Sequence, residues 1–273
     1  MYDLGVYQYR YRLGEAMTPP SSDTLIARQP HTPATRFSCV GCGGCCRGRF
    51  VPLTLSEARI WLQRGDPVAV LIEAFEASTW PTSQEAYHYN VQRSAPVACG
   101  ATTVNVTVIL AAQAIPQCPN LQADNSCGIY TERPLVCRIY PMEISPFIAL
   151  QPSQKDCPPE SWQQGEVLEH DPQLAALIEA SRQADRDDAV LKVGLCETLG
   201  LTVAAWKSDG LTLYHPDQAH LRAAIDTPVQ PQHADALWQV QTQTPGLRER
   251  LAELALALDD REQLPYVFHP LTH

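Results

Sequence analysis

Four cysteines within eight residues constrain this chain more than any other feature of its sequence. They are Cys39, Cys42, Cys45 and Cys46. Thiols at this density are typical of a chelating loop, and glycines at positions 41, 43 and 44 let such a loop adopt positive φ and point N–H groups at sulfur. A second set follows at wider spacing: Cys118, Cys127, Cys137 and Cys157. The sequence therefore predicts a metal centre, and we expect the two cysteine blocks to meet in space.

The chain is long enough to build a hydrophobic core without help from metal. It has 273 residues, of which 45% are hydrophobic. The first ten residues lack a basic start followed by an apolar stretch, and the longest apolar run, residues 106–115, is too short to cross a bilayer. We therefore expect a soluble cytoplasmic protein with no membrane contact. In that reducing compartment, clustered cysteines are more often metal ligands or redox thiols than disulfides.

The charge balance argues against nucleic-acid binding. The formal net charge is −10 and no run rich in Lys and Arg occurs, whereas phosphate binding needs a basic face. The expected partner is a small molecule or another protein of unknown identity. Guanidinium groups near the cysteines can offset the charge of thiolate ligands, with ordinary surface ion pairs as the alternative. These arginines are Arg36, Arg47, Arg49, Arg133 and Arg138.

Local patterns in the first half favour a mixture of helices and strands. Residues 1–35 are rich in Pro, Ser and Thr, which predicts a loosely ordered N-terminal arm. Residues 54–57 read as a capping box that starts a helix ending at Gly65. Asp66 and Pro67 then predict the start of a second helix through residue 75.

Alternating apolar residues further along the chain predict strands. The segments 87–92 and 104–108 read as two paired strands joined through a turn at 98–100. A third strand is predicted at 144–150, at a sheet edge because it contains Pro146.

The second half changes to helical periodicity. Helices are predicted at 174–184, 189–199, 219–225, 234–241 and 247–258, with a hairpin around 208–210. The two remaining cysteines, Cys99 and Cys196, are expected to pack in the core. The predicted fold class is α+β: a small cysteine-rich metal-binding module at 36–160, followed by a mainly helical acidic region at 161–273.

Three segments carry a resemblance to a known family. They are residues 37–48 (FSCVGCGGCCRG), 118–121 (CPNL) and 127–141 (CGIYTERPLVCRIYP). Together they resemble the CxxCxxCC cysteine-cluster family, also called YkgJ-type, which is described as zinc- or iron-chelating. The resemblance spans residues 37–157 and implies a bound metal or iron–sulfur centre. Some members of that family resemble flagellin lysine N-methylases, which implies methyl transfer from S-adenosylmethionine as one option.

The spacing of the first block favours an iron–sulfur cluster over zinc. The pattern C-x2-C-x2-C supplies three ligands of a ferredoxin-like [4Fe–4S] loop, and either Cys118 or Cys157, each followed by Pro, fits as the fourth. Zinc would instead take Cys42 and Cys45 with two cysteines of the second block. Redox thiols without metal are a third option. Histidine is absent from both blocks, which argues against a hydrolytic zinc centre.

All eight clustered cysteines are candidate ligands, but Cys45 and Cys46 are expected to point apart because they are adjacent. Cys46 would then join a second centre, form a thiol pair beside the first, or be buried beneath the loop. Four further side chains are predicted to tune the sulfurs or hold an anion there: Arg47, Arg133, Arg138 and Tyr140. Packing of Tyr130 and Tyr140 in the core, with Arg133 in an ion pair, is the alternative.

The function expected from the sequence is binding of a cysteine-ligated iron–sulfur centre, for electron transfer or for radical or methyl-transfer chemistry. The alternative is a zinc-stabilised interaction module without enzymatic activity. No catalytic residue is predicted, and the sequence does not decide whether the protein is an enzyme.

Overall fold

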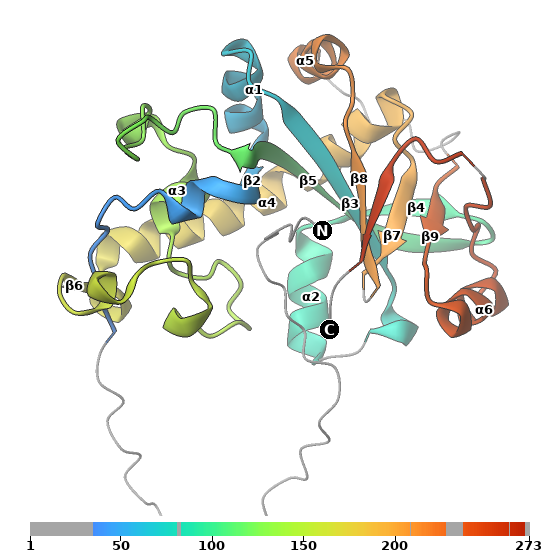
Figure 1. Ribbon diagram of the computed structural model, residues 1–273. Coiled ribbons are helices and arrows are strands. Elements are labelled where there is room, and N and C mark those ends of the chain that lie inside the picture. Colours follow the sequence, from blue (N-terminus) through green and yellow to red (C-terminus); the bar gives the residue numbers. More distant parts are fainter. Residues whose placement is uncertain (1–34, 81–82, 208, 228–236, 262, 271–273) are drawn as a thin grey trace, which may run out of the picture.

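A twisted eight-stranded sheet forms the centre of the molecule in the computed structural model (Figure 1). The structure describes residues 35–80, 83–207, 209–227, 237–261 and 263–270. The strands of this sheet are β2 (Arg47–Leu53), β3 (Val68–Phe75), β4 (Ala95–Cys99), β5 (Thr102–Gln117), β7 (Val203–Trp206), β8 (Gly210–Tyr214), β9 (Gln239–Gln241) and β10 (Val267–Pro270). A separate two-stranded sheet pairs β1 (Arg36–Phe37) with β6 (Glu166–Val167).

Six α-helices accompany the sheet in the described part of the chain. They are α1 (Leu55–Gln63), α2 (Gln84–Gln92), α3 (Leu135–Ile139), α4 (Pro172–Thr198), α5 (Gln218–Asp226) and α6 (Pro245–Glu253). The 3-10 helix η1 (Gly44–Cys46) lies between the first cysteines and β2. Among these described helices none is both long and apolar enough to pass through a bilayer.

Strands β3 and β5 organise the sheet. Strand order is β10-β8-β3-β5-β2, and β5 carries β2 and β4 at different points along its length. On the other side of β3, β8 pairs antiparallel with Val70–Ile72 and β7 pairs parallel with Glu73–Ala74. The sheet thus joins strands from both halves of the sequence.

The alternation of side chains along β3 produces two hydrophobic layers. Val70 and Ile72 belong to the main core cluster, which also includes Trp61, Leu195 and Leu221 from the helices. The neighbouring Ala69 and Leu71 point into a smaller cluster on the opposite face. All eight residues of β3 are buried, so this strand lies in the middle of the fold.

The carboxylate of Glu57 connects α1 to α3. The predicted capping box is confirmed: Thr54 Oγ1 accepts from the Glu57 N–H at 3.1 Å, and Glu57 Oε2 accepts from the Thr54 N–H at 2.9 Å. The second oxygen of Glu57 accepts from the Leu135 N–H at 2.7 Å, at the start of α3. Since Cys137 lies on α3, this carboxylate helps to position part of the cysteine region.

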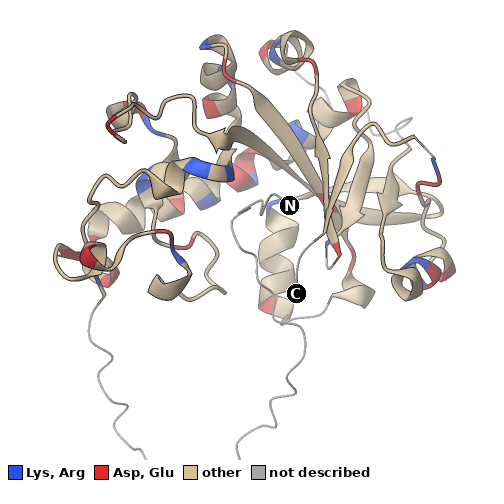
Figure 2. Cartoon of the chain, in the orientation of Figure 1, with Lys and Arg blue, Asp and Glu red and all other residues tan. Residues whose placement is uncertain are grey.

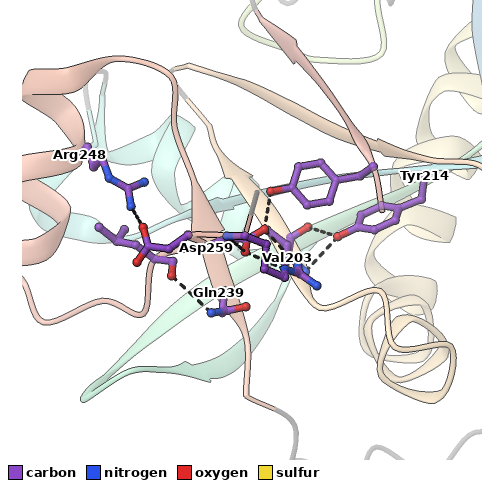
Figure 3. A network of polar contacts seen from close by, with 9 residues as sticks. Val203, Tyr214, Gln239, Arg248 and Asp259 are labelled. Carbon is purple, nitrogen blue, oxygen red and sulfur yellow. Dashed lines mark hydrogen bonds and ion pairs between the residues drawn. The ribbon is translucent and has the colours of Figure 1, made fainter. Parts of the chain in front are cut away.

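A polar network fastens the C-terminal segment to the sheet (Figure 3). Asp259, which is 3% exposed, accepts hydrogen bonds from Arg261 and, at 2.6 Å, from the Tyr266 hydroxyl. Tyr214 donates to the Val203 carbonyl at 2.9 Å, and Gln239 Nε2 donates to the Leu258 carbonyl at 3.3 Å. The network therefore joins β7, β8 and β9 to the chain beyond α6.

Two predicted elements in the first half are wrong. Residues 68–75 form strand β3 instead of a helix, because Val68, Val70 and Ile72 are β-branched and every residue there is buried within the sheet. Residues 84–92 form helix α2 instead of a strand. Ser83 caps this helix by accepting from the Ala86 N–H, and Ala86 and Asn90 face the interior four residues apart.

The other expectations for the strands fare differently. The strand over 104–108 is confirmed within β5, and the turn near 98–100 is confirmed, but its partner strand is β4 at 95–99. Residues 144–150 form no strand, since the chain bends there and Ser145 Oγ accepts from the Phe147 N–H. Cys99 and Cys196 are fully buried, as expected.

The second half contains strands that the sequence analysis did not expect. The two helices predicted at 174–199 form one helix, α4, and the helix predicted at 247–258 ends at Glu253. Of the helix predicted at 234–241, residues 239–241 are strand β9 and residues 234–236 lie outside the described residues. The strands flanking the predicted hairpin, β7 and β8, pair with β3 instead of with each other.

The α+β class is confirmed, but a small module followed by a separate helical region is not. Strand β3 from the first half pairs directly with β7 and β8 from the second half, so residue 160 does not divide the sheet. The predicted N-terminal arm, apart from Thr35, lies outside the described residues. Charged residues lie mainly on helices and loops, with both signs interspersed, while most residues of the strands are uncharged (Figure 2).

Candidate metal centre

The first cysteine block forms a tight loop that leads into β2. Gly43 precedes η1 with φ +70°, a left-handed conformation that favours glycine, and Gly41 has φ +69°. Gly44 lies so close to the second block that a Cβ there would be 2.9 Å from the Asp156 carbonyl oxygen. The Gly44 N–H points at the Cys42 sulfur, 3.5 Å away. Gly43 therefore lets the loop turn sharply, and Gly44 lets it lie against the segment that holds Cys157.

The end of the central hairpin places Cys46 beside Cys118. The Cys118 N–H donates to the Cys46 carbonyl at 2.7 Å, where β2 and β5 pair. The chain then turns back, with the Leu121 N–H donating to the Cys118 carbonyl and Leu121 bridging to Cys127. Arg47 joins the two loops, since it donates to the Gly43 carbonyl at 2.9 Å and to Asn125 Oδ1 at 2.7 Å. The prediction that the blocks meet is confirmed at the backbone.

The remaining two cysteines reach the region from α3 and from the segment after it. Cys137 and Cys118 are both partly buried against the main core cluster. Cys157 follows Asp156, whose carboxylate forms an ion pair with Arg49 on β2. The Tyr140 hydroxyl oxygen accepts from the Asp156 N–H at 3.1 Å and lies 3.7 Å from the Cys157 sulfur. Tyr140 thus holds the backbone beside Cys157.

The sulfur atoms do not form a closed coordination sphere. Within the described residues, no group of three or more Cys, His, Asp or Glu side chains lies at metal-binding distance. None of the ten cysteines is in a disulfide. Cys45 and Cys46 do not point apart as expected: their sulfurs lie 3.9 Å apart, because the rotamers of adjacent residues can bring two sulfurs together.

Electrostatic interactions connect cysteines of the two blocks, and Cys45 acts on Cys137 as well as on Cys157. Burial, and then the nearby charges of Cys45, Cys42 and Cys39, raise the pKa of Cys157 to about 11, although the hydrogen bond with Tyr140 lowers it. Burial and then the charges of Cys45, Cys118 and Cys127 raise the pKa of Cys137 to about 12, while Arg133 lowers it. We call Cys39, Cys42, Cys45 and Cys157 the loop set. Cys46, Cys118, Cys127 and Cys137 are the inner set.

The neighbouring thiols do not all ionise with the same ease. The hydrogen bond with Cys46 and the charge of Arg49 lower the pKa of Cys45 to about 6, although burial opposes this. The same hydrogen bond, with burial, raises the pKa of Cys46, and burial raises that of Cys118. Several adjacent thiolates need a cation to offset their charge, so this donor set suits a thiolate-bound metal.

The predicted arginines and Tyr140 have different surroundings. Arg47 donates hydrogen bonds to both the first cysteine loop and the loop that contains Asn125. Tyr140 accepts a hydrogen bond from the backbone beside Cys157. Arg133 stacks on Tyr130 with its guanidinium carbon 3.8 Å from the ring centre, and donates to the Tyr130 carbonyl. Arg138 is exposed on α3, and its guanidinium makes no hydrogen bond or ion pair with a described residue. Tyr130 is 59% exposed, so it does not pack in the core.

Sequence reasoning missed two residues that connect the loops. Asp156 and Asn125 accept from Arg49 and Arg47, respectively, and both lie outside the recognised motifs. The position of Asp156 directly before Cys157 was the only sequence signal for its role. Asn125 gave a weaker signal: it lies in a run of turn-forming residues, Asp124, Asn125 and Ser126, and in the structure it has φ +67°.

A small cavity lies behind α3. Its volume is about 60 Å³, and its lining includes Val136, Glu143, Asp185 and the buried side chain of Lys192. Lys192 Nζ lies 3.6 Å from an Asp185 oxygen. No cysteine is among the described residues that line this cavity, whose walls come from β2, α1, β5, α3 and α4.

A family model matches the cysteine region. The model of the CxxCxxCC family, described as "Putative zinc- or iron-chelating domain", matches residues 38–158. No match was found among curated proteins or among solved structures.

Proposed function

Because the model of the CxxCxxCC family matches residues 38–158, we propose that this chain binds an iron–sulfur cluster through the loop set. Cys39, Cys42 and Cys45 are the C-x2-C-x2-C ligands, and Cys157 is the fourth. The close approach of Gly44 to the Asp156 carbonyl supports this proposal most directly, because it brings the Cys157 segment against the loop. Cys118 is the other candidate, but its backbone N–H donates to the carbonyl of Cys46, outside the loop set.

Residues around the loop set provide what such a cluster needs. The Gly44 N–H is directed at the Cys42 sulfur, and donors to sulfur stabilise the negative charge of a thiolate-bound cluster. Arg49 adds a positive charge near Cys45. When bound, the cluster would supply one-electron transfer. Cys39 and Cys42 are exposed, so a redox partner could approach this side.

Zinc binding by an interaction module is the second candidate. Two sulfurs on one tetrahedral zinc ion, with bonds of about 2.3 Å, lie roughly 3.8 Å apart. The separation of 3.9 Å between the Cys45 and Cys46 sulfurs is similar. This observation favours zinc at that pair, whereas the loop spacing favours a cluster.

Metal analysis of protein purified without oxygen separates the two candidates. We expect brown protein with iron and acid-labile sulfide, and loss of both in Cys42→Ala. Cys196→Ala is the matched control, because Cys196 is buried in α4 away from the loops and alanine is favoured in helices. Colourless protein that contains zinc and no sulfide would exclude the iron–sulfur proposal.

A further inference from the structure

One face of α4 brings polar side chains into the cavity behind α3. Ser181, Asp185 and Lys192 line the cavity, and because they are four and seven residues apart along the helix, they lie on the same side of it. Much of the remaining wall is apolar, with Leu53 from β2 and Val136 from α3. A pocket that combines apolar walls with a few convergent polar groups is typical of a small-molecule site.

The hydrogen-bond donors in this cavity have few acceptors. Lys192 is 3% exposed, yet its Nζ lies 3.6 Å from an Asp185 oxygen and 3.8 Å from an Asp188 oxygen, beyond hydrogen-bond distance. Ser181 is 6% exposed, and its hydroxyl makes no hydrogen bond with a described residue. Ser145, also buried, accepts from a backbone N–H at 3.3 Å. Since buried donors are normally paired, these groups favour a ligand that supplies acceptor oxygens.

Most carboxylates around the cavity already have other partners. Both oxygens of Glu57 accept from backbone N–H groups, and Glu143 forms an ion pair with Lys155. Asp188 does not line the cavity, and its Oδ2 accepts from the backbone N–H at the start of α1 at 2.7 Å. Among the described carboxylates that line the cavity, this leaves Asp185 to balance the cations there.

Two cations share the Asp185 carboxylate. Arg93 Nη2 lies 3.7 Å from one oxygen, and Lys192 Nζ lies 3.6 Å from the other. Charged groups separated by more than about 3.5 Å leave space for a third polar group between them. Two positive charges against one negative charge favour an anion as that group.

We propose that this cavity binds a small monocarboxylate, whose carboxylate accepts from Lys192 and the serine hydroxyls and whose short apolar chain packs on Leu53 and Val136. The cavity volume of about 60 Å³ sets the size of the ligand, because one water needs about 10–15 Å³. A ligand of about four to six non-hydrogen atoms fits. No cysteine is among the described residues that line the cavity, so this inference does not rest on the proposed metal centre.

Isothermal titration calorimetry on the full-length protein tests the ligand class. Sodium propionate is the probe, and propionamide has the same shape without the charge. At constant ionic strength we expect saturable binding of propionate, with propionamide at least about 10-fold weaker, because hydrogen bonds to a charged group are the stronger ones. This comparison uses the wild-type protein and therefore needs no variant to fold.

Two variants with matched controls test the location. Ser181→Ala removes one hydroxyl from a helix that tolerates alanine, and should raise the Kd for propionate about 2- to 10-fold. Lys192→Met keeps the length of the side chain and removes its charge, and should raise the Kd about 10- to 100-fold. Ser153→Ala and Arg222→Met change exposed residues elsewhere and should leave the Kd unchanged.

Each result decides for or against the site. Equal binding of propionate and propionamide would reject a carboxylate ligand. Propionate binding that is unchanged in Ser181→Ala would place the ligand elsewhere and overturn the inference, even where Lys192→Met fails to fold. The absence of saturable heat would show that the cavity holds water only. Metal analysis of the same protein reports on the proposed function separately, since propionate binding and metal content can each fail alone.

Discussion

At Gly44, a single hydrogen in place of a side chain keeps two distant parts of the sequence together. A Cβ would lie 2.9 Å from the Asp156 carbonyl oxygen, which is backbone and cannot rotate away. We expect Gly44→Ala to push the Cys157 segment outward, lower the bound iron and cost about 1–3 kcal/mol of unfolding free energy. Iron analysis and thermal unfolding measure the two effects. Gly246→Ala is the control, since nothing lies within 4 Å of that position. Full iron content in Gly44→Ala would show that the close approach is unimportant.

Two arginines near the cysteines offer a matched comparison. The Arg49 side chain is 15% exposed and pairs with Asp156, whereas Arg138 is exposed without such a partner among the described residues. We expect Arg49→Ala to weaken metal retention about 10- to 100-fold, as loss of a group supporting the ligands does. Arg138→Ala should retain metal like the wild type. Competition with a chelator measures both, and equal losses would show that the ion pair has no special role.

Some of the residues around the candidate metal centre could be recognised from the sequence and others could not. The cysteines and glycines were recognisable because chelation needs those residue types at close spacing. The partner of Arg49 was not, because Asp156 reaches it only after the chain has folded. The contact between Cys45 and Cys46 depends on rotamers, which an average angle between neighbouring side chains does not determine.

Among the secondary-structure elements, we expect the C-terminal segment to be sensitive to acid because Asp259 holds it to the sheet. Burial raises the pKa of this carboxyl, but hydrogen bonds from Arg261 and Tyr266 outweigh it and hold the pKa below its ordinary value. A depressed pKa adds stability above the unfolded-state value of about 3.9, and that stability is lost as pH falls through the folded-state pKa. We expect Asp259→Asn to cost about 2–3 kcal/mol at pH 7, where charged hydrogen bonds are lost, and progressively less as pH falls below about 4.

Urea unfolding of both proteins across this pH range measures the difference. Asp260→Asn is the control, because that carboxylate is 77% exposed and pairs with Arg248 at the surface. A difference between wild type and Asp259→Asn that does not shrink at any pH below about 4 at which the protein remains folded would contradict the assignment.

Elements with a strong local signal were predicted and those decided by tertiary contacts were not. The capping box at Thr54 and Glu57 forms because both hydrogen bonds are local. Residues 68–75 follow the helix-start residues Asp66 and Pro67, yet burial between β5 on one side and β7 and β8 on the other makes them a strand. Tyr87, Tyr89 and Val91 alternate like a strand, but five residues are too short a window to distinguish that pattern from α2.

Across the molecule, the cysteine region shares its sheet with strands from the second half of the chain. Strand β3 has one edge on β5 and the other on β7 and β8, so removing the second half exposes a buried strand along its length. Helix α4 packs on α3, which carries Cys137, and Arg182 of α4 donates to the Ile144 carbonyl at 2.7 Å. The family match ends at residue 158, but the contacts that support it continue.

We therefore expect a fragment of residues 35–160 not to fold on its own, even with iron, sulfide and zinc supplied. Without α4, β7 and β8, residues such as Val70, Ile72 and Leu71, each at most 1% exposed in the full chain, would face water. An exposed strand edge of this kind also pairs with other chains, so aggregation is the expected behaviour. Dispersed amide resonances and a cooperative unfolding transition are the measurements, with the full chain as control. A fragment that binds metal and unfolds cooperatively would show that the cysteine region is an autonomous domain, and the predicted boundary near residue 160 would then hold.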